Sequence, residues 1–238
     1  MNKLIKNIMN HASLKNQPPV LVDIGASGFI HKKWRKIAKY SVCIAFDADT
    51  RDFDASEIED KGWRKLIKLN RLVATHPSNA VDFYLTKSPH CSSTLQPDEK
   101  ALEPWAFNQL FNVVDTIKLP ATDIKTTLEE TDLEYIDWFK TDSQGTDLRI
   151  FCSIPEKISN NILIAEFEPG IIDAMNGEDK LHALMAYMDV KPFWVTNMKI
   201  FGSNRISQTD LSSLNFIQKR SLGSFLKTAP GWCEITYI

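Results

Sequence analysis

The 238-residue sequence lacks long hydrophobic runs, contains only four cysteines and nine glycines, and has a formal net charge of −2. No segment approaches the 18 consecutive apolar residues of a membrane-spanning helix, so no membrane span is expected. The low glycine content excludes a collagen-like or linker-rich chain. Cys43, Cys91, Cys152 and Cys233 form no CxxC pair, and no histidine stands at ligand spacing from them. This argues against a zinc site or a disulfide framework and indicates free thiols in the cytoplasm.

The near-zero net charge gives no general reason to expect a nucleic-acid partner. It conceals an asymmetry, because Lys and Arg are in excess over residues 1–80 and Asp and Glu over the rest. The basic clusters His31–Lys36 and Arg64–Lys68 fit amphipathic helices with solvated charged faces, so we expect no nucleic acid there. We expect part of the acidic excess to line a reaction cleft.

Hydrophobic residues (43%) and charged residues (24%) are in the proportions of a globular protein, and we expect one domain over residues 1–238. Short apolar runs alternate with helical patterns, which is typical of an α/β protein with a mostly parallel sheet between helices on both faces. The expected strands are Val20–Val22, Val42–Phe46, Leu69–Ala74, Tyr135–Lys140, Ile162–Phe167, Phe193–Val195 and Cys233–Ile238.

Two segments depart from this alternation. Residues 1–16 are expected to form a leading helix, and residues 77–120 a hairpin or a long loop near a substrate site. At the other end, the strand-like run from Trp232 to Ile238 has the alternation of an antiparallel edge strand, and the chain could be part of a longer protein.

A glycine-containing turn, Asp23-Ile24-Gly25-Ala26-Ser27-Gly28, follows the first expected strand. Such a turn lets a ligand approach the backbone, although a plain strand-to-helix turn also uses glycine. The GxxG spacing lacks one glycine of the GxGxxG pattern that binds dinucleotides, so a ligand without pyrophosphate is favoured. Asp23, Gly25, Ala26, Ser27 and Gly28 are therefore candidate cofactor contacts.

The second expected strand ends at Asp47, 22 residues after Gly25. An acid about 20 residues beyond the glycine turn binds ribose hydroxyls in nucleotide-binding α/β folds. Asp47 and the adjacent Ala48 are therefore candidate contacts of an adenosine-containing cofactor, and Asp49 could contribute.

A third motif, Lys140-Thr141-Asp142-Ser143-Gln144-Gly145-Thr146-Asp147, follows the strand containing Tyr135 and Ile136. Together with the Asp23–Gly28 turn and Ala45-Phe46-Asp47, it resembles the FkbM-type S-adenosylmethionine-dependent methyltransferases, which carry a Lys-x-Asp-x-Glu/Gln-Gly-x-Glu/Asp signature at this place. The resemblance spans roughly residues 18–200 and includes Ser92-Ser93 and Ile164–Glu168. Asp47 stands where glutamate is more usual, and Ala48 where proline is common.

The resemblance implies a class I methyltransferase (Rossmann-like) fold, a seven-stranded sheet with an antiparallel last strand. It also implies S-adenosylmethionine as cofactor and O-methylation of a small-molecule acceptor, a sugar or secondary metabolite. The substrate contacts that it implies are Ser92, Ser93, Gln144, Glu166 and Glu168.

Candidate catalytic groups are Asp142 and His90. Asp142 follows a strand and should face the cofactor, although it could instead cap the next helix. His90 lies in a loop and could act as a general base or be merely solvated. Asp142, Glu166 and Glu168 could together bind Mg²⁺, but we favour no metal and expect these acids to orient the substrate or cofactor.

Two other classes of function remain open. An NAD-linked oxidoreductase would use the same strand-end acid, against which the missing glycine argues. A non-catalytic binding module could retain the same fold.

Overall fold

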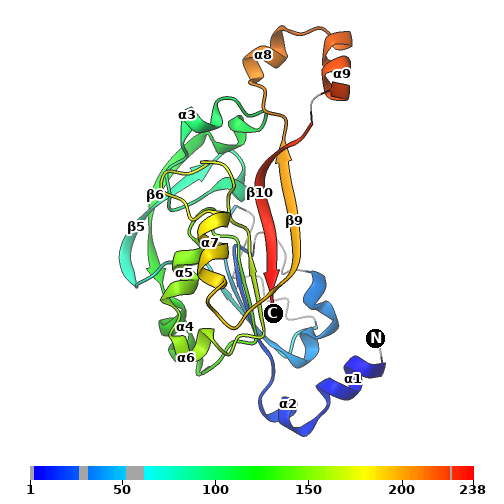
Figure 1. Ribbon diagram of the computed structural model, residues 1–238. Coiled ribbons are helices and arrows are strands. Elements are labelled where there is room, and N and C mark those ends of the chain that lie inside the picture. Colours follow the sequence, from blue (N-terminus) through cyan, green and yellow to red (C-terminus); the bar gives the residue numbers. More distant parts are fainter. Residues whose placement is uncertain (1–2, 27–31, 52–61, 226) are drawn as a thin grey trace.

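The computed structural model describes residues 3–26, 32–51, 62–225 and 227–238. It is an α/β structure with a seven-stranded sheet and a separate three-stranded sheet (Figure 1). The strands of the large sheet are β1 (Val20–Ile24), β2 (Val42–Phe46), β3 (Lys65–Leu69), β7 (Trp138–Thr141), β8 (Ile164–Phe167), β9 (Val195–Ser203) and β10 (Ala229–Tyr237). Those of the small sheet are β4 (Leu72–Val73), β5 (Ser78–Thr86) and β6 (Val113–Thr122).

The helices are mostly short. The α-helices are α1 (Lys3–Met9), α2 (Ala12–Asn16), α3 (Glu99–Leu102), α4 (Ile124–Thr131), α5 (Asp147–Ser153), α6 (Glu156–Ser159), α7 (Leu181–Met188), α8 (Gln208–Ser213) and α9 (Phe216–Phe225). The 3₁₀ helices are η1 (Lys32–Lys36), η2 (Ala38–Tyr40), η3 (Pro89–Cys91) and η4 (Asn108–Phe111).

The large sheet has the order β3-β2-β1-β7-β8-β10-β9 and is parallel from β3 to β8. β10 is antiparallel to both of its neighbours. The expected α/β class, the mostly parallel sheet and the antiparallel last strand are confirmed. The expected edge position is wrong, because β10 lies between β8 and β9. Its alternation arises because Cys233, Ile235 and Tyr237 face the core.

Hydrophobic side chains cover the two faces of the sheet differently. On one face Val22, Phe139 and Phe167 pack with residues of α4, α5 and α7. On the other face, Leu21 and Cys43 pack with Trp34 of η1. The expected helical pattern after β1 is therefore realised in the described residues as the short 3₁₀ helices η1 and η2.

The segment around residue 69 was assigned wrongly. We expected a helix over Arg64–Lys68 and a strand over Leu69–Ala74. Instead Lys65–Leu69 is β3, paired in parallel with β2, and Leu72–Val73 is β4 of the small sheet. The lysines that suggested a charged helix face lie on an edge strand, where their side chains can reach water.

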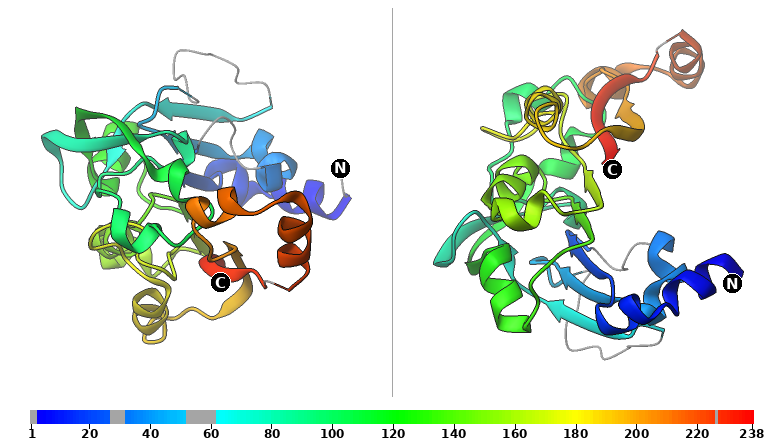
Figure 2. Two further views of the ribbon diagram at one scale, coloured as in Figure 1. Left: turned by 90° about the horizontal axis from the view of Figure 1, so that it is seen from above. Right: turned by 60° about the horizontal axis from the view of Figure 1, so that its bottom comes forward.

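The segment 77–120 contains the expected hairpin, since β5 and β6 pair antiparallel and form most of the small sheet. The leading segment is two short helices, α1 and α2, rather than one. They lie at the opposite end of the molecule from α8 and α9, which are carried beyond the sheet between β9 and β10 (Figures 1 and 2).

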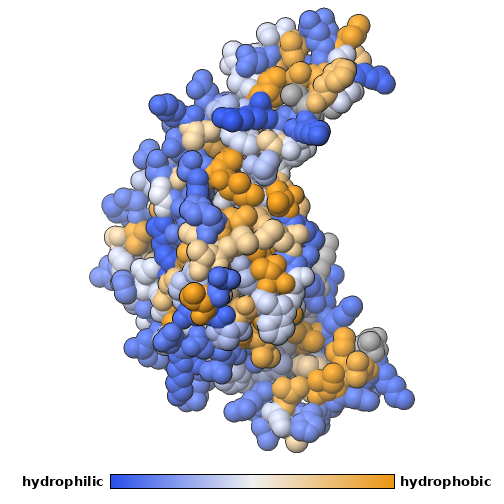
Figure 3. Space-filling model, viewed as in Figure 1, coloured by the Kyte–Doolittle hydropathy of each residue, from blue (hydrophilic) through white to orange (hydrophobic). Residues whose placement is uncertain are grey.

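Large hydrophobic side chains remain exposed at that outer end. Phe216, Ile217 and Phe225 of α9 are more than two-thirds exposed, and hydrophobic residues are visible there in Figure 3. Among the described residues, no helix combines the length and hydrophobicity that crossing a membrane requires.

Candidate active site

The candidate residues gather because four neighbouring parallel strands end at one edge of the sheet. Gly25, Asp47, Asp142 and Glu168 are the residues that directly follow β1, β2, β7 and β8. In open α/β sheets, ligands bind in the crevice outside the carboxyl ends of the strands. The strand order thus brings together residues more than 140 positions apart in the chain.

The turn after β1 is tightly packed at Gly25. Gly25 has φ +74°, and a Cβ built on it would lie 2.1 Å from the carbonyl oxygen of Asp142. The amides of Gly25 and Ala26 both donate to the carbonyl of Phe46, at 3.0 and 2.9 Å. The glycine is therefore required for the backbone of β1 to approach the end of β7. Ser27 and Gly28, the other expected contacts in this turn, lie outside the described residues.

Asp23 is buried and bonded to the third motif. Its Oδ1 accepts from Lys140 Nζ at 3.2 Å, and Asp23 lines neither of the two cavities described below. Burial alone would lower the pKa of Lys140, but the carboxyl groups of Asp23, Asp142 and Glu168 raise it above its ordinary value. The first and third motifs are thus held together by a buried ion pair. Ala26 packs its side chain in the core beside Trp34.

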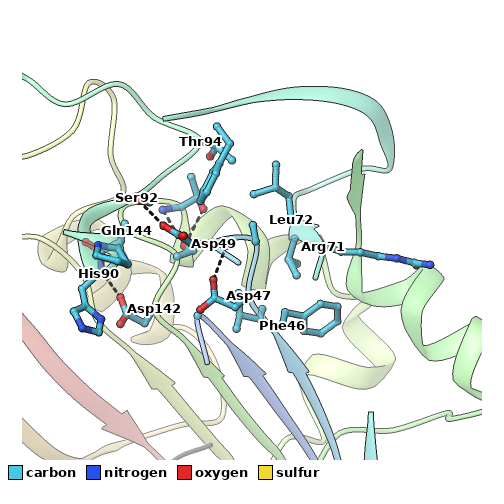
Figure 4. A pocket seen from close by; sticks show the side chains of 18 residues that line it. Phe46, Asp47, Asp49, Arg71, Leu72, His90, Ser92, Thr94, Asp142 and Gln144 are labelled. Carbon is cyan, nitrogen blue, oxygen red and sulfur yellow. Dashed lines mark hydrogen bonds between the residues drawn. The ribbon is translucent and has the colours of Figure 1, made fainter. Parts of the chain in front are cut away.

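A narrow cleft of about 70 Å³ opens at the ends of β1, β2 and β7 (Figure 4). Its walls include Asp47, Ala48 and Asp49, and hydrophobic residues of β2, β4 and β5. Asp47 Oδ1 accepts from the amide of Asp49 at 2.8 Å. An acid and apolar walls at adjacent strand ends suit a ribose and a purine ring.

Asp49 connects this cleft to the hairpin. Its carboxylate accepts from Arg51 Nε at 2.8 Å and from Ser92 Oγ at 3.0 Å, and Arg51 also donates to the carbonyl of Thr86. Burial raises the pKa of Asp49, but hydrogen bonds from Arg51 and Ser92 outweigh it and lower the pKa overall. Ser92, an expected substrate contact, therefore fastens the hairpin to the end of β2 while lining the cleft.

A second cavity of about 630 Å³ lies beside the cleft, and His90, Asp142 and Gln144 line both. The volume is within the range of small-molecule sites. Gln144 Nε2 donates to Asp142 Oδ1 at 2.5 Å (Figure 4). Gln144 has φ 55°, and the carbonyl of this left-handed residue accepts from Ser93 Oγ at 2.8 Å. Ser93 is thus buried and positions Gln144 rather than lining either cavity.

Asp142 and Glu168 have raised pKa values. For Asp142, burial and the nearby Asp147 outweigh the lowering effect of Lys140, and its pKa is raised to about 6. For Glu168, burial is the largest cause, followed by the charge of Asp142, and its pKa is raised to about 9. Two carboxyl groups at the cavity edge are thus held in different protonation states at neutral pH, which suits acid–base chemistry.

Asp147, the last acid of the third motif, is buried and structural. Its Oδ1 accepts from Thr141 Oγ1 at 2.9 Å and from the amide of Ser143 at 2.8 Å, and its Oδ2 accepts from the amide of Glu168 at 3.1 Å. Asp147 lies at the start of α5 and joins the ends of β7 and β8. It therefore holds Asp142 and Glu168 in place without lining either cavity.

We predict that Asp147→Asn lowers the free energy of unfolding by about 2 kcal/mol, because an amide nitrogen then faces N–H or O–H donors and leaves them unpaired. Urea unfolding monitored by circular dichroism would measure this. The exposed Asp115→Asn on β6 should stay within ±0.5 kcal/mol of the parent. Equal stability of the two variants would show that the Asp147 bonds contribute little.

Glu166 occupies a different environment from Glu168. Its carboxylate accepts from Lys33 Nζ, and from Trp138 Nε1 at 3.0 Å, and it lines neither cavity. Glu168 lies beyond the end of β8, where the strand's alternation of side chains no longer applies, so Glu166 and Glu168 do not act together on one ligand as we expected. Among the residues that the structure describes, no group of three or more His, Cys, Asp and Glu side chains is arranged to hold a metal ion. Asp142 thus lines both the cleft and the second cavity and Glu168 lines the second cavity, whereas Asp147 and Glu166 line neither.

Several residues of the second cavity escaped the sequence analysis. They are Phe107 and Phe111 from the hairpin segment, Glu178 from the loop after β8, and Phe201, Trp232 and Glu234 from β9 and β10. The unusual 77–120 segment was expected to lie near a substrate site, which was the available signal for Phe107 and Phe111. The individual side chains depend on strand pairing that no local motif indicates.

Comparison of the sequence with models of known protein families and with curated proteins gives no significant match.

Proposed function

We propose that this protein is an S-adenosylmethionine-dependent methyltransferase that transfers a methyl group to a hydroxyl of a sugar or secondary metabolite. The observation that carries the proposal is that the cleft at the ends of β1 and β2 and the larger cavity share Asp142, His90 and Gln144. A cleft for a donor and a cavity for an acceptor that meet at a titratable group form an arrangement suited to group transfer. The second partner is then a small molecule rather than a nucleic acid.

The sheet supports the same proposal. The class I methyltransferase fold expected from the motifs has seven strands, mostly parallel, with an antiparallel last strand, and the observed sheet has all three features. A generic doubly wound sheet does not need an antiparallel strand such as β10, inserted between the two strands that precede it in the chain. The three motifs that carried the resemblance also meet at one edge of this sheet.

The polar and apolar residues of the cleft match the chemical groups of the donor. Asp47 would bind the ribose hydroxyls, the walls formed by Leu72 and Phe83 would contact the adenine, and Asp142 would face the sulfonium end. The enclosed volume of about 70 Å³ is smaller than a nucleoside needs, so we expect the walls to separate when the donor binds.

When bound, S-adenosylmethionine supplies an electrophilic methyl group, and the protein must align the acceptor hydroxyl with it and remove the proton. Alignment of the two reactants lowers the activation free energy by about 7–11 kcal/mol in favourable cases. Asp142 accepts the hydroxyl proton, because a carboxyl group with a pKa of about 6 is ionised at neutral pH and still basic enough to act. His90 lines both cavities and is the second candidate base.

Isothermal titration calorimetry with S-adenosylmethionine tests the proposal. We expect micromolar binding by the parent and by Asp115→Asn, and at least ten-fold weaker binding by Asp47→Ala, which loses the ribose contact. NAD⁺ titrated in parallel should give no heat of binding. Binding of NAD⁺ in preference to S-adenosylmethionine would support the oxidoreductase alternative, and binding of neither at millimolar concentration would contradict the proposal.

If S-adenosylmethionine binds but no hydroxyl acceptor is methylated, the binding-module alternative would be favoured. A methylation assay with a radiolabelled donor and a panel of hydroxyl compounds distinguishes these outcomes.

A further inference from the structure

The lining of the larger cavity is acidic and aromatic. It includes four carboxyl groups, those of Asp142, Glu168, Glu178 and Glu234, while no Lys or Arg stands among the described residues that line it. Because this cavity of about 630 Å³ has acids and no Lys or Arg in its lining, it offers no cationic partner to a phosphate or carboxylate group and disfavours both. The occupant is therefore neutral or positively charged.

Glu168 distinguishes between these two possibilities. In the described structure its carboxyl oxygens accept no hydrogen bond, and Lys140, the cation whose charge acts on it, is already paired with Asp23 at 3.2 Å. The carboxyl groups of Asp142 and Glu234 also act on it. Glu168 is protonated at neutral pH, and a ligand that brings a positive charge would stabilise its ionised form, lower its pKa and displace its proton to solvent.

Part of the cavity wall is formed by aromatic rings. Phe201 and Trp232 are stacked with their centroids 5.7 Å apart, and Phe107 meets Trp232 edge to face at 6.3 Å. Aromatic faces attract cations and also pack against the apolar face of a ring-shaped ligand. The wall is therefore compatible with a ring that carries an ammonium group.

The other acids already have partners. Glu178 accepts from the amide of Ala174 at 2.6 Å, and Glu234 is 3.8 Å from Lys199 at the surface. Burial, the largest cause, raises the pKa of Glu178 to about 7. Glu168 is thus the acid of the cavity that lacks both a hydrogen-bond donor and an ion-pair partner in the described structure.

We infer that the larger cavity binds an acceptor that carries a protonated amine beside its hydroxyl groups, of the amino-sugar class, with Glu168 as the partner of the ammonium group. This inference rests on the proposed function, because it names the class of acceptor for the same transfer. It concerns the acceptor cavity alone, so it can be tested without the methyl donor.

The test is calorimetry of three sugars of similar size, glucosamine, glucose and glucuronate, which are respectively cationic, neutral and anionic at pH 7. We expect glucosamine to bind at least ten-fold more tightly than glucose, and glucuronate to bind most weakly. Glu168→Gln should abolish the preference for glucosamine, whereas the exposed Glu103→Gln, outside the cavity, should retain it. Thermal melting checks that both variants are folded.

Equal binding of glucosamine and glucose, a preference for glucuronate, an unchanged preference in Glu168→Gln, or no binding of any of the three sugars at millimolar concentration would each overturn the inference. Failure of S-adenosylmethionine to bind, with the glucosamine preference intact, would instead contradict the methyltransferase proposal alone. The two failures are therefore distinguishable.

Discussion

Replacing Gly25 with alanine is expected to lower the free energy of unfolding by about 2–5 kcal/mol and to abolish binding of the donor. An L-residue at φ +74° costs about 1–2 kcal/mol. The added Cβ would also lie 2.1 Å from the carbonyl of Asp142, which forces the ends of β1 and β7 apart at a further cost of about 1–3 kcal/mol. Urea unfolding and donor calorimetry measure the two effects.

Gly177 provides a matched control for this variant. It has a similar φ of +71°, but a Cβ built on it meets nothing within 4 Å. Gly177→Ala should therefore show only the backbone cost, about 1–2 kcal/mol, and leave donor binding unchanged. If the two variants lose equal stability, the close approach of Gly25 to Asp142 is not what requires the glycine.

Replacing Asp142 with asparagine is expected to reduce the rate of methyl transfer by about 10²–10⁴-fold, because the base that accepts the hydroxyl proton is lost. Asparagine keeps an oxygen that can accept from Gln144, so the loop can retain its conformation. The parent rate should fall as the pH drops below about 6, where Asp142 becomes protonated. The residual rate of Asp142→Asn should lack this dependence. A methylation assay across pH 5–8 measures both.

The stability of Asp142→Asn separates catalysis from structure. Burial holds the folded pKa of Asp142 above its unfolded value, so the ionised group opposes folding as the pH rises above that unfolded value. Asp142→Asn should therefore melt at the parent temperature or higher at pH 7. A slow variant that also melts much earlier would indicate a structural role, and an unchanged rate would remove Asp142 from catalysis.

Local patterns were sufficient where the chemistry is local. The run Val42–Phe46 is buried along its whole length and forms β2 over the predicted residues. The turn at Gly25 and the acids Asp47 and Asp142 could be found because each directly follows an apolar run, and parallel strands place such residues together. The hairpin in the 77–120 segment was recognisable from its departure from the alternation.

Other assignments depended on partners distant in the chain. Lys65–Leu69 has the composition of a charged helix, and its strand conformation comes from pairing with β2. In the sequence, Asp147 and Glu166 look like Asp142 and Glu168, since all four are acids at or near a strand end. In the structure, Asp147 accepts hydrogen bonds at the ends of two strands, and Glu166 binds Lys33 and Trp138. Which acid faces the cavity is decided by these contacts rather than by sequence spacing.

The sequence by itself determined the α/β class, the mostly parallel sheet and the positions of the strand-end acids, because burial periodicity and glycine turns are properties of adjacent residues. Only the tertiary structure decided that β10 lies inside the sheet and that its Trp232 and Glu234 reach the same cavity as Asp142 and Glu168. Pairing β10 with β8 joins residues more than 60 positions apart, and the free energy of that pairing depends on the packed core, which no local pattern contains.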